Sequence, residues 1–445
     1  MRKRVAIVGS GIAGLSAAHH LQGHAHISLF EAGRYFGGHS HTVDITLPGQ
    51  HGDITHGVDT GFLVYNERTY PGLIDLFEQL NVQTAHSDMS FSVQTTWQPG
   101  GQKLEWNGSN LNSVFAQRSN LLRPRFWGLL KDIVRFNTLA TNLAQAHNDG
   151  ALMQPLQAFL DTHGFGDTFR DGYLLPMLGC IWSCPTSQML QFPAATMVRF
   201  CDNHGLLQVN NRPQWFTVQG GAKHYVQAIT ARIENKYLNT PVQSIERDHS
   251  GVVLHTARGA ERFDHVVIAA HADQSLQMLA QPTAEERDVL SHIGFQNNRA
   301  VLHTDQSVMP QKRLAWAAWN YERAANQAQE STRVCLHYLL NKLQPLPFEQ
   351  AVVVSLNPVS AIRDDLVLGS YDYAHPVFDM PAIDAQAKMP LLQGQQHTWY
   401  AGAWMGYGFH EDGLKAGMSV AREWIKRSLG GEGAATQSAL YRADA

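Results

Sequence analysis

Three glycines and one acid near the amino terminus have the types and spacing to bind a dinucleotide. Gly9, Gly11 and Gly14 follow a short apolar run, Val5 to Val8, and Glu31 stands twenty residues after Gly11. This glycine spacing allows a tight turn, lets backbone approach a pyrophosphate and lets a helix pack closely on a strand. The start of that helix favours phosphate through its free N–H groups and dipole. The acid can accept hydrogen bonds from an adenosine ribose, which indicates FAD or NAD and not NADP.

Two strands and a helix must position these residues. The apolar run Val5 to Val8 predicts a fully buried parallel strand. Residues 12–21 predict the helix, with Ile12 and Ala13 in its first turn, and residues 27–31 predict the second strand. An ordinary strand-turn-helix is the alternative, but the complete set of strand, glycine turn, helix and acid favours the dinucleotide.

The residues that follow the acid indicate which of the two cofactors, FAD or NAD, is bound. Ala32 and Arg34 are followed by Gly37, Gly38 and His39. This stretch resembles the extended fingerprint of the flavin-dependent amine oxidase and phytoene desaturase superfamily, in which an arginine and then Gly-Gly-Arg or Gly-Gly-His follow the acid. Twin glycines allow close approach of backbone to the cofactor, and the arginine can make a charge-assisted contact with phosphate. The resemblance therefore implies FAD.

A second segment near the carboxyl end resembles the same superfamily. Trp399 to Gly417 predicts a strand, a glycine-rich loop and a helix, and it is similar to the superfamily's C-terminal flavin motif. There an acid binds the ribityl chain or pyrophosphate, and the helix dipole stabilises negative charge at flavin N1 and C2=O. Because covalent flavin links in this superfamily use a cysteine here and this segment has none, we expect non-covalent FAD. The resemblance assigns to FAD the residues Gly402, Phe409, His410, Glu411, Asp412, Gly413 and Ala416.

Three shorter segments resemble parts of the superfamily that touch the cofactor. Residues 57–61 match the segment where the chain passes close to the flavin, although a plain β-turn explains their glycine and acid equally well. A valine after an extended piece matches the position that pairs by backbone with adenine, and the Ala-Ala-His-Ala turn lies beside the cofactor in related proteins. The residues assigned on this basis are Gly57, Asp59, Thr60, Gly61, Val242 and Ala269.

Within that superfamily, the chain resembles a bacterial group of predicted NAD/FAD-binding oxidoreductases. The group is marked by Gly-Gly-His-Ser/Thr, a pair such as Trp319-Asn320, and Gly-Phe-His-Glu-Asp-Gly. Its plant relatives are fused to cyclopropane fatty acid synthases, which implies lipid or fatty acyl chemistry. By the same analogy a lipid-modifying enzyme or a membrane surface is an expected partner. The flavin would take a hydride from a C–H bond, and the candidates for a catalytic role are His410, Lys223 and Trp319.

The single dinucleotide fingerprint bears on the path of electrons. Flavin reductases with two dinucleotide domains need a second glycine-rich turn in mid-chain, and this sequence has none. Electrons are therefore expected to enter from an oxidisable substrate and to leave to an external acceptor such as oxygen, a quinone or a protein. The alternatives are an NAD(P)H donor bound without the motif, a non-redox isomerase or mutase, an oxidase of a small amine, and a flavin that is structural in a lipid-modifying complex.

An apolar segment and two tryptophans suggest the class of substrate. Residues 173–183 are nearly free of charge and form either protein core or the wall of an apolar cavity. Trp316 and Trp319 are predicted to lie on opposite faces of one strand. We expect residues 174–181, with Trp182, Phe192 and these two tryptophans, to line an elongated apolar pocket for a hydrophobic or lipid substrate.

The whole chain is predicted to be an α/β protein. We expect a Rossmann-like FAD-binding domain of the glutathione-reductase-2 type, with an inserted α+β substrate domain of the amine oxidase kind. The FAD-binding domain is predicted to comprise residues 1–68, 201–285 and 385–445, and the substrate domain residues 69–200, which are mostly helical, and 286–384.

Composition excludes several classes of function. Hydrophobic residues make up 44% of the 445 residues and the net charge is −4, which argues against a disordered chain and against binding of nucleic acid. No apolar stretch is long enough to span a bilayer, and the basic start Arg2 to Arg4 leads into a strand and not into a signal peptide, so a cytoplasmic location is expected. The four cysteines lack a Cys-x-x-Cys pair and are expected to be buried thiols, and no metal site is predicted.

Overall fold

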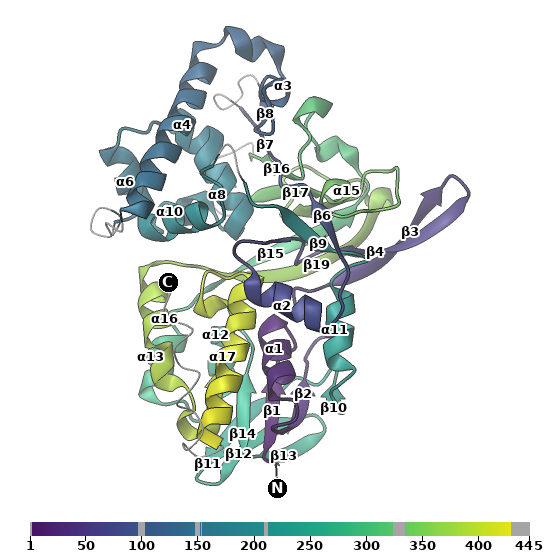
Figure 1. Cartoon of the computed structure of the whole chain (residues 1–445), viewed down its shortest axis with the longest axis vertical. Helices are drawn as coiled ribbons and strands as arrows, with labels where there is room; N and C mark the ends of the chain where they lie inside the picture. Colours follow the sequence, from purple (N-terminus) through teal and green to yellow (C-terminus); the bar gives the residue numbers. More distant parts are fainter. Residues whose placement is uncertain are drawn as a thin grey trace. The chain divides into compact units, whose positions relative to one another are not determined.

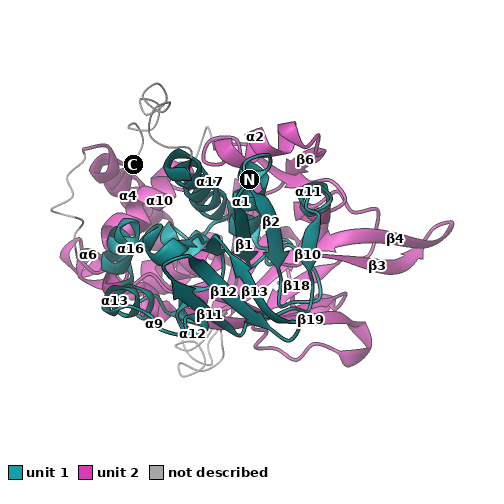
Figure 2. Cartoon of the chain, turned by 90° about the horizontal axis from the view of Figure 1, so that it is seen from below, with its two compact units in different colours: residues 1–40, 225–294, 382–445 teal, residues 41–224, 295–381 magenta. Residues whose placement is uncertain are grey.

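The chain folds into two compact units in the computed structural model, which describes residues 2–96, 103–146, 152, 154–208, 212–323 and 334–428 (Figure 2). Unit 1 comprises residues 1–40, 225–294 and 382–445, and unit 2 comprises residues 41–224 and 295–381. These limits differ from the predicted domain limits, most of all at the first and second crossings. The hairpin that follows residue 40 explains the difference, because Thr42 and Asp59 accept hydrogen bonds from the backbone of Lys223 and Ala222 and so hold both stretches in unit 2.

Unit 1 is built on a parallel sheet with strand order β10-β2-β1-β14-β20 (Figure 1). Its strands are β1 (Arg4–Val8), β2 (His26–Phe30), β10 (Asn235–Tyr237), β14 (His265–Ile268) and β20 (Thr398–Tyr400). The central strand β1 pairs with a neighbour on each side, and Val5, Ala6 and Ile7 are fully buried. This position accounts for the uninterrupted apolar run in the sequence.

A small antiparallel sheet and several helices complete the described part of unit 1. The sheet consists of β11 (Ser244–Asp248), β12 (Gly251–Thr256) and β13 (Gly259–Phe263). The helices are α1 (Ile12–Leu21), α11 (Lys223–Thr230), α12 (Ala272–Met278), α13 (Ala284–Leu290), α16 (Met380–Leu392) and α17 (His410–Ser428), with the first residues of α11 and α16 belonging to unit 2.

Unit 2 contains a seven-stranded sheet with the order β19-β15-β18-β17-β16-β7-β8 (Figure 1). Its strands are β7 (Phe91–Thr96), β8 (Lys103–Asn107), β15 (Phe295–His303), β16 (Trp319–Glu322), β17 (Cys335–Leu339), β18 (Val353–Leu356) and β19 (Val367–Pro376). The strands β3 (Thr42–Gly49) and β4 (Gly52–Asp59) form a separate hairpin. A small separate sheet consists of β5 (Tyr65–Asn66), β9 (Trp215–Val218) and β6 (Thr84–Ser87).

The helices of unit 2 lie mainly between residues 111 and 203. They are α2 (Pro71–Gln79), α3 (Leu111–Val114), α4 (Pro124–Gln145), α6 (Leu156–Thr162), α7 (Asp167–Phe169), α8 (Leu175–Trp182), α9 (Thr186–Met189), α10 (Ala194–Asn203) and α15 (Leu340–Leu343). A π-helical turn, η2 (Arg170–Leu174), precedes α8. The apolar segment of the sequence therefore forms η2 and α8.

Two predictions about unit 2 are wrong. Within the predicted helical stretch, residues 84–87, 91–96 and 103–107 form strands. β6 pairs with β9 and β7 with β16, both far away in the sequence, and β8 pairs with β7. The strand predicted to carry both Trp316 and Trp319 begins only at Trp319. The side chain of Asn320 accepts from Ala317 N at 2.9 Å and donates to Ala317 O at 2.7 Å, so the backbone of Ala317 bonds to this side chain and not to a neighbouring strand.

Helices α1 and α17 pack at a distance that only glycine allows. A Cβ atom on Gly417 would lie 2.1 Å from the carbonyl oxygen of Ala13, and one on Gly413 would lie 2.7 Å from Cγ2 of Ile12. The hydroxyl of Ser16 donates to Leu414 O at 2.8 Å. Helices α1 and α17, which lie far apart in the sequence, are therefore in direct contact inside unit 1.

We predict that Gly417→Ala lowers the free energy of unfolding by about 1–3 kcal/mol, because the added methyl group forces the helices apart. Gly128→Ala is the matched control, since a Cβ there, within α4, would meet no atom within 4 Å. Alanine should be neutral or stabilising by up to about 1 kcal/mol at that position. Urea unfolding of both variants checks this, and equal stability of the two would show that the close helix contact is not required.

Candidate functional site

The glycine turn after β1 leaves open space at the start of α1. Gly9 has φ +99°, and its N–H donates to Phe30 O at 2.8 Å. A Cβ on Gly14 would lie 2.0 Å from Gly9 O, whereas a Cβ on Gly11 would meet no atom within 4 Å. Gly11 is the N-cap residue of α1, and no side chain caps the helix. This turn therefore fits the phosphates of a dinucleotide, which would face the N–H groups of the first helical turn.

Glu31 holds the two glycine-rich segments of unit 1 in place. Its Oε2 accepts from Ser10 N at 2.9 Å and from the Ser10 hydroxyl, and its Oε1 accepts from Gly33 N at 2.7 Å. The Ser10 hydroxyl also accepts from Gly37 N at 3.1 Å. One carboxylate consequently fixes the turn after β1 and the loop after β2.

The glycine pair of that loop packs on the first turn. Gly37 and Gly38 have φ of +124° and +58°, and a Cβ on Gly38 would lie 3.1 Å from the Cα of Gly11. Ala32 and Arg34 are exposed in the same loop, and His39 is half-buried. The structure therefore brings together the predicted residues from Gly9 to His39.

The carboxyl-terminal motif lies in the same unit. Asp412 Oδ2 accepts from Phe409 N at 2.9 Å, which caps α17, and burial raises the pKa of Asp412 to about 6. Trp404, beside Gly402, donates from Nε1 to Ala270 O at 3.0 Å, and Ala269 N donates to Val8 O at 2.7 Å. These bonds join the motif and the small-residue turn to the β1 end of the sheet.

Three further predicted residues occupy different environments in unit 1. Glu411 is buried and lies 3.8 Å from Lys415 Nζ, while Ala416 is half-buried on α17. Val242 is buried, and the nearby Thr240 N donates to Glu31 O at 2.9 Å. Val242, which is predicted to pair with adenine, thus stands two residues after a backbone hydrogen bond to Glu31.

His410 joins a polar cluster that sequence analysis did not identify. Its Nε2 lies 2.8 Å from the Tyr225 hydroxyl and 3.0 Å from the Ser40 hydroxyl, and these two hydroxyls also bond to each other. Desolvation lowers the pKa of His410 to about 3, so the imidazole is neutral near pH 7. Each partner stands in or next to a glycine-pair motif, Gly-Gly-His-Ser and Gly-Gly-Ala-Lys-His-Tyr, and this proximity is the signal that could have found them.

The predicted residues 57–61 belong to unit 2, and their hydrogen bonds described here join them to other residues of that unit. Asp59 is buried and accepts from Ala222 N at 2.9 Å, from Gln344 Nε2 at 2.8 Å and from the Thr42 hydroxyl, and burial raises its pKa to about 6. The Thr60 hydroxyl lies 2.7 Å from the Tyr373 hydroxyl.

The remaining members of that segment and the candidate lysine also belong to unit 2. A Cβ on Gly57 would lie 2.6 Å from Gly220 O, and Gly61 follows β4. Lys223 Nζ forms an ion pair with Asp44, which accounts for its charge and offers no sign of a catalytic base.

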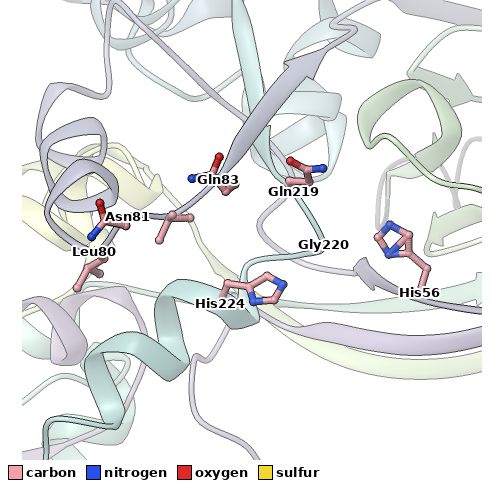
Figure 3. Close-up of a pocket in the computed structure, with 8 residues that line it drawn as sticks. His56, Leu80, Asn81, Gln83, Gln219, Gly220 and His224 are labelled. Atoms are coloured by element: carbon pink, nitrogen blue, oxygen red, sulfur yellow. The ribbon is translucent and has the colours of Figure 1, made fainter.

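A pocket of about 580 Å³ opens in unit 2 (Figure 3). It is lined by His56, Leu80, Asn81, Val82, Gln83, Gln219, Gly220 and His224. Burial, and then the charge of Lys223, lower the pKa of His56 from its ordinary value. None of the residues predicted to line an apolar pocket belongs to this one, so it is a different site.

Most apolar residues of the predicted pocket pack against other side chains of unit 2. Leu174, Leu178 and Phe192 are buried, and Trp182 packs with its ring centre 4.6 Å from that of Phe200. Trp316 joins a separate cluster with Val308, Met309, Leu339, Ala351 and Val353. Most of this set is therefore protein core.

Known families, proteins and structures that resemble this chain indicate its family. A family model described as flavin containing amine oxidoreductase matches residues 12–315, which is more than half of the chain. The chain belongs to the flavin-containing amine oxidoreductase family. FAD is its cofactor.

The relatives agree with this assignment. The chain is 26% identical over 278 residues to a Mycobacterium tuberculosis protein named "Putative flavin-containing monoamine oxidase AofH", and the match covers 60% of this chain and 56% of that protein. The chain thus spans a little over half the length of this relative.

Solved structures confirm the predicted fold class. Cyclohexylamine oxidase from Brevibacterium oxydans superposes with a TM-score of 0.69 at 16% identity, over 97% of this chain and 100% of that chain. A CLA-producing fatty acid isomerase from P. acnes gives 0.63 at 16% identity, over 95% and 98%. Among the described residues, no helix combines the length and the apolar character needed to cross a membrane.

We predict that Glu31→Gln lowers FAD affinity by one to two decades. The loss of a charge-assisted hydrogen bond costs about 1.5–3 kcal/mol, which corresponds to that change in affinity. Glu246→Gln, an exposed acid on β11, is the control and should bind FAD as the natural protein does. Fluorescence titration of the flavin-free protein measures both, and an unchanged affinity of Glu31→Gln would contradict the role of this carboxylate.

We predict that His410 makes unit 1 sensitive to acid. Its pKa of about 3 lies below its ordinary value of 6.5, so the unfolded chain binds a proton between these values and the folded chain does not. Stability is therefore lost as pH falls below 6.5, by about 2 kcal/mol at pH 5 relative to pH 7.5.

The variant His410→Gln should lack this component when urea unfolding is compared at the two pH values. His249→Gln, which changes an exposed histidine of the same unit, serves as the control and should keep the acid sensitivity of the natural protein. The same pH dependence in His410→Gln and in the natural protein would refute the prediction.

Proposed function

We propose that this protein is an FAD-dependent oxidoreductase that removes a hydride from a C–H bond of an organic substrate. The observation that carries the proposal is the turn at Gly9 and Gly11, which is held by Glu31 and open where phosphate must lie. When bound, FAD supplies the group that accepts the hydride. The chain's own residues then have to bind the cofactor, orient the substrate and exclude water.

Several residues of unit 1 would hold the cofactor without a covalent bond. The N-terminus of α1 would bind the pyrophosphate, and Glu31 would accept from the adenosine ribose with its remaining lone pairs. The start of α17 would place its positive dipole end toward the flavin ring. Because His410 is neutral there, it contributes hydrogen bonds and no further positive charge.

We extend the proposal to an apolar substrate, either fatty acyl or another lipid, bound by unit 2. The support is the contact of α8 with β16, which joins the two parts of the predicted substrate domain, residues 69–200 and 286–384. Ile181 and Trp319 remain partly exposed there, and Trp319 packs edge-to-face on Tyr338 with ring centres 5.0 Å apart. Burial raises the pKa of Tyr338, so its hydroxyl stays neutral beside this apolar surface.

Oxidation of a small amine is the second candidate, favoured by the name of the Mycobacterium tuberculosis relative. In either case the electrons would leave to an external acceptor such as oxygen, a quinone or a protein. A cytoplasmic location beside a lipid-modifying enzyme or a membrane surface suits the lipid candidate.

Anaerobic flavin reduction tests the proposal. Unsaturated fatty acid vesicles should bleach the flavin absorbance of the purified protein, whereas cyclohexylamine should not. Reduction by cyclohexylamine alone would replace the lipid proposal with the amine proposal. Conversion of the fatty acid to an isomer without lasting reduction would instead indicate a non-redox isomerase.

We predict that Trp319→Ala lowers the rate of this reduction by at least about tenfold, which corresponds to the loss of roughly 1.4 kcal/mol of apolar contact. Trp316→Ala is the matched control, because this tryptophan belongs to a different cluster of the same unit. Stopped-flow absorbance measures both variants, and equal rates would remove Trp319 from the substrate site.

A further inference from the structure

One face of the large sheet in unit 2 carries a row of buried polar side chains. Glu322 on β16 stands opposite Cys335 on β17, and His337, two residues further on, stands opposite Ser355 on β18. Residues two apart on a strand, and residues directly opposite on neighbouring strands, share a face of the sheet. Cys335 and His337 are buried, and the Glu322 side chain is 19% exposed.

Three potential metal ligands of this row converge on one point. The carboxylate of Glu322, the thiol of Cys335 and Nε2 of His337 all lie within 4.8 Å of one another. His337 Nε2 is 2.9 Å from Glu322 Oε2, while Cys335 Sγ is 3.6 Å from that nitrogen and 3.7 Å from that oxygen.

These separations resemble those around tetrahedral zinc. Zn–S of about 2.3 Å, Zn–N of about 2.0–2.1 Å and Zn–O of about 2.0–2.2 Å require roughly 3.6 Å from sulfur to either light atom and roughly 3.4 Å between nitrogen and oxygen. The sulfur of Cys335 already stands at these distances. Only His337 and Glu322 must separate, by roughly 0.5 Å, and the partly exposed Glu322 can move that far.

The surroundings fix the imidazole in the orientation that a metal ligand needs. His337 Nδ1 lies 2.6 Å from the Ser355 hydroxyl, which is 2.7 Å from His303 Nε2. His303 Nδ1 in turn accepts from Asp305 N at 3.0 Å. Histidine ligands usually donate their second ring N–H to such a partner, and Ser355 is placed to accept it.

We propose that Glu322, Cys335 and His337 form a Zn²⁺ site whose fourth position is open to water. A thiolate and an imidazole with one carboxylate suit zinc, whereas magnesium and calcium prefer oxygen ligands alone. The ion would clip the end of β16 to the start of β17. The sequence gives no sign of it, because its ligands are spread over two strands and form no familiar spacing.

Competition titration tests this site on the full-length protein with its FAD bound. Zn²⁺ added against a coloured chelator should bind at one equivalent per chain. Cys335→Ser and Glu322→Gln should each weaken binding by at least about 100-fold, and Ser355→Ala by about 10–100-fold. Cys201→Ser changes an equally buried thiol of unit 2 and should leave zinc affinity unchanged.

Cobalt substitution shows whether the sulfur is a ligand. The difference spectrum between Co²⁺-loaded and Zn²⁺-loaded protein, in which the flavin cancels, should contain a thiolate-to-cobalt charge-transfer band that Cys335→Ser abolishes. Circular dichroism checks that each variant is folded. If Cys335→Ser does not fold, Glu322→Gln still tests the site, because position 322 is partly exposed. A natural protein that takes up no zinc at micromolar free Zn²⁺, or variants that bind it equally, would overturn the proposal and leave a hydrogen-bonded network only.

Discussion

The bonds of the Glu31 carboxylate are the constraint on which unit 1 depends. They connect Ser10, in the turn after β1, with Gly33, in the loop after β2. A carboxylate with several N–H and O–H donors is held more firmly than a neutral acceptor would be. Because both glycine-rich segments are fixed by one side chain, the space at Gly11 keeps its shape before any cofactor enters. Such preorganisation reduces the entropy cost of binding.

The second constraint is the closeness of α1 and α17. The glycines at 413 and 417 let α17 lie directly on α1, the helix that we propose to bind the pyrophosphate. The two segments that resemble the superfamily's flavin motifs therefore pack on each other within unit 1. His410, Tyr225 and Ser40 add hydrogen bonds to this surface from three separate segments. Desolvation keeps His410 neutral there.

The elements that the sequence predicts correctly are those specified by local chemistry. A glycine turn between an apolar strand and a helix leaves few conformations for β1, α1 and β2, and residues 398–428 form the predicted strand, loop and helix. The errors arise where partners distant in the sequence decide the structure. β7 pairs with the distant β16, and the backbone before Trp319 bonds to the side chain of Asn320.

The candidate sites divide in the same way. The glycines and Glu31 can be predicted from their spacing, because one short segment of the sequence forms the candidate phosphate site. The His410 cluster and the Glu322, Cys335 and His337 cluster do not, since each is assembled from separate strands or segments. Trp316 and Trp319 stand three residues apart, yet they belong to different surroundings because Trp316 lies before β16 and Trp319 begins it.

The flavin content of the purified chain tests the central claim most directly. Acid precipitation should release a yellow supernatant that contains one FAD per chain, identified by its mass, and leave a colourless pellet. Flavin retained by the precipitated polypeptide would contradict non-covalent binding. A purified, folded chain that neither carries FAD nor takes it up when supplied would contradict the account of the glycine turn and Glu31.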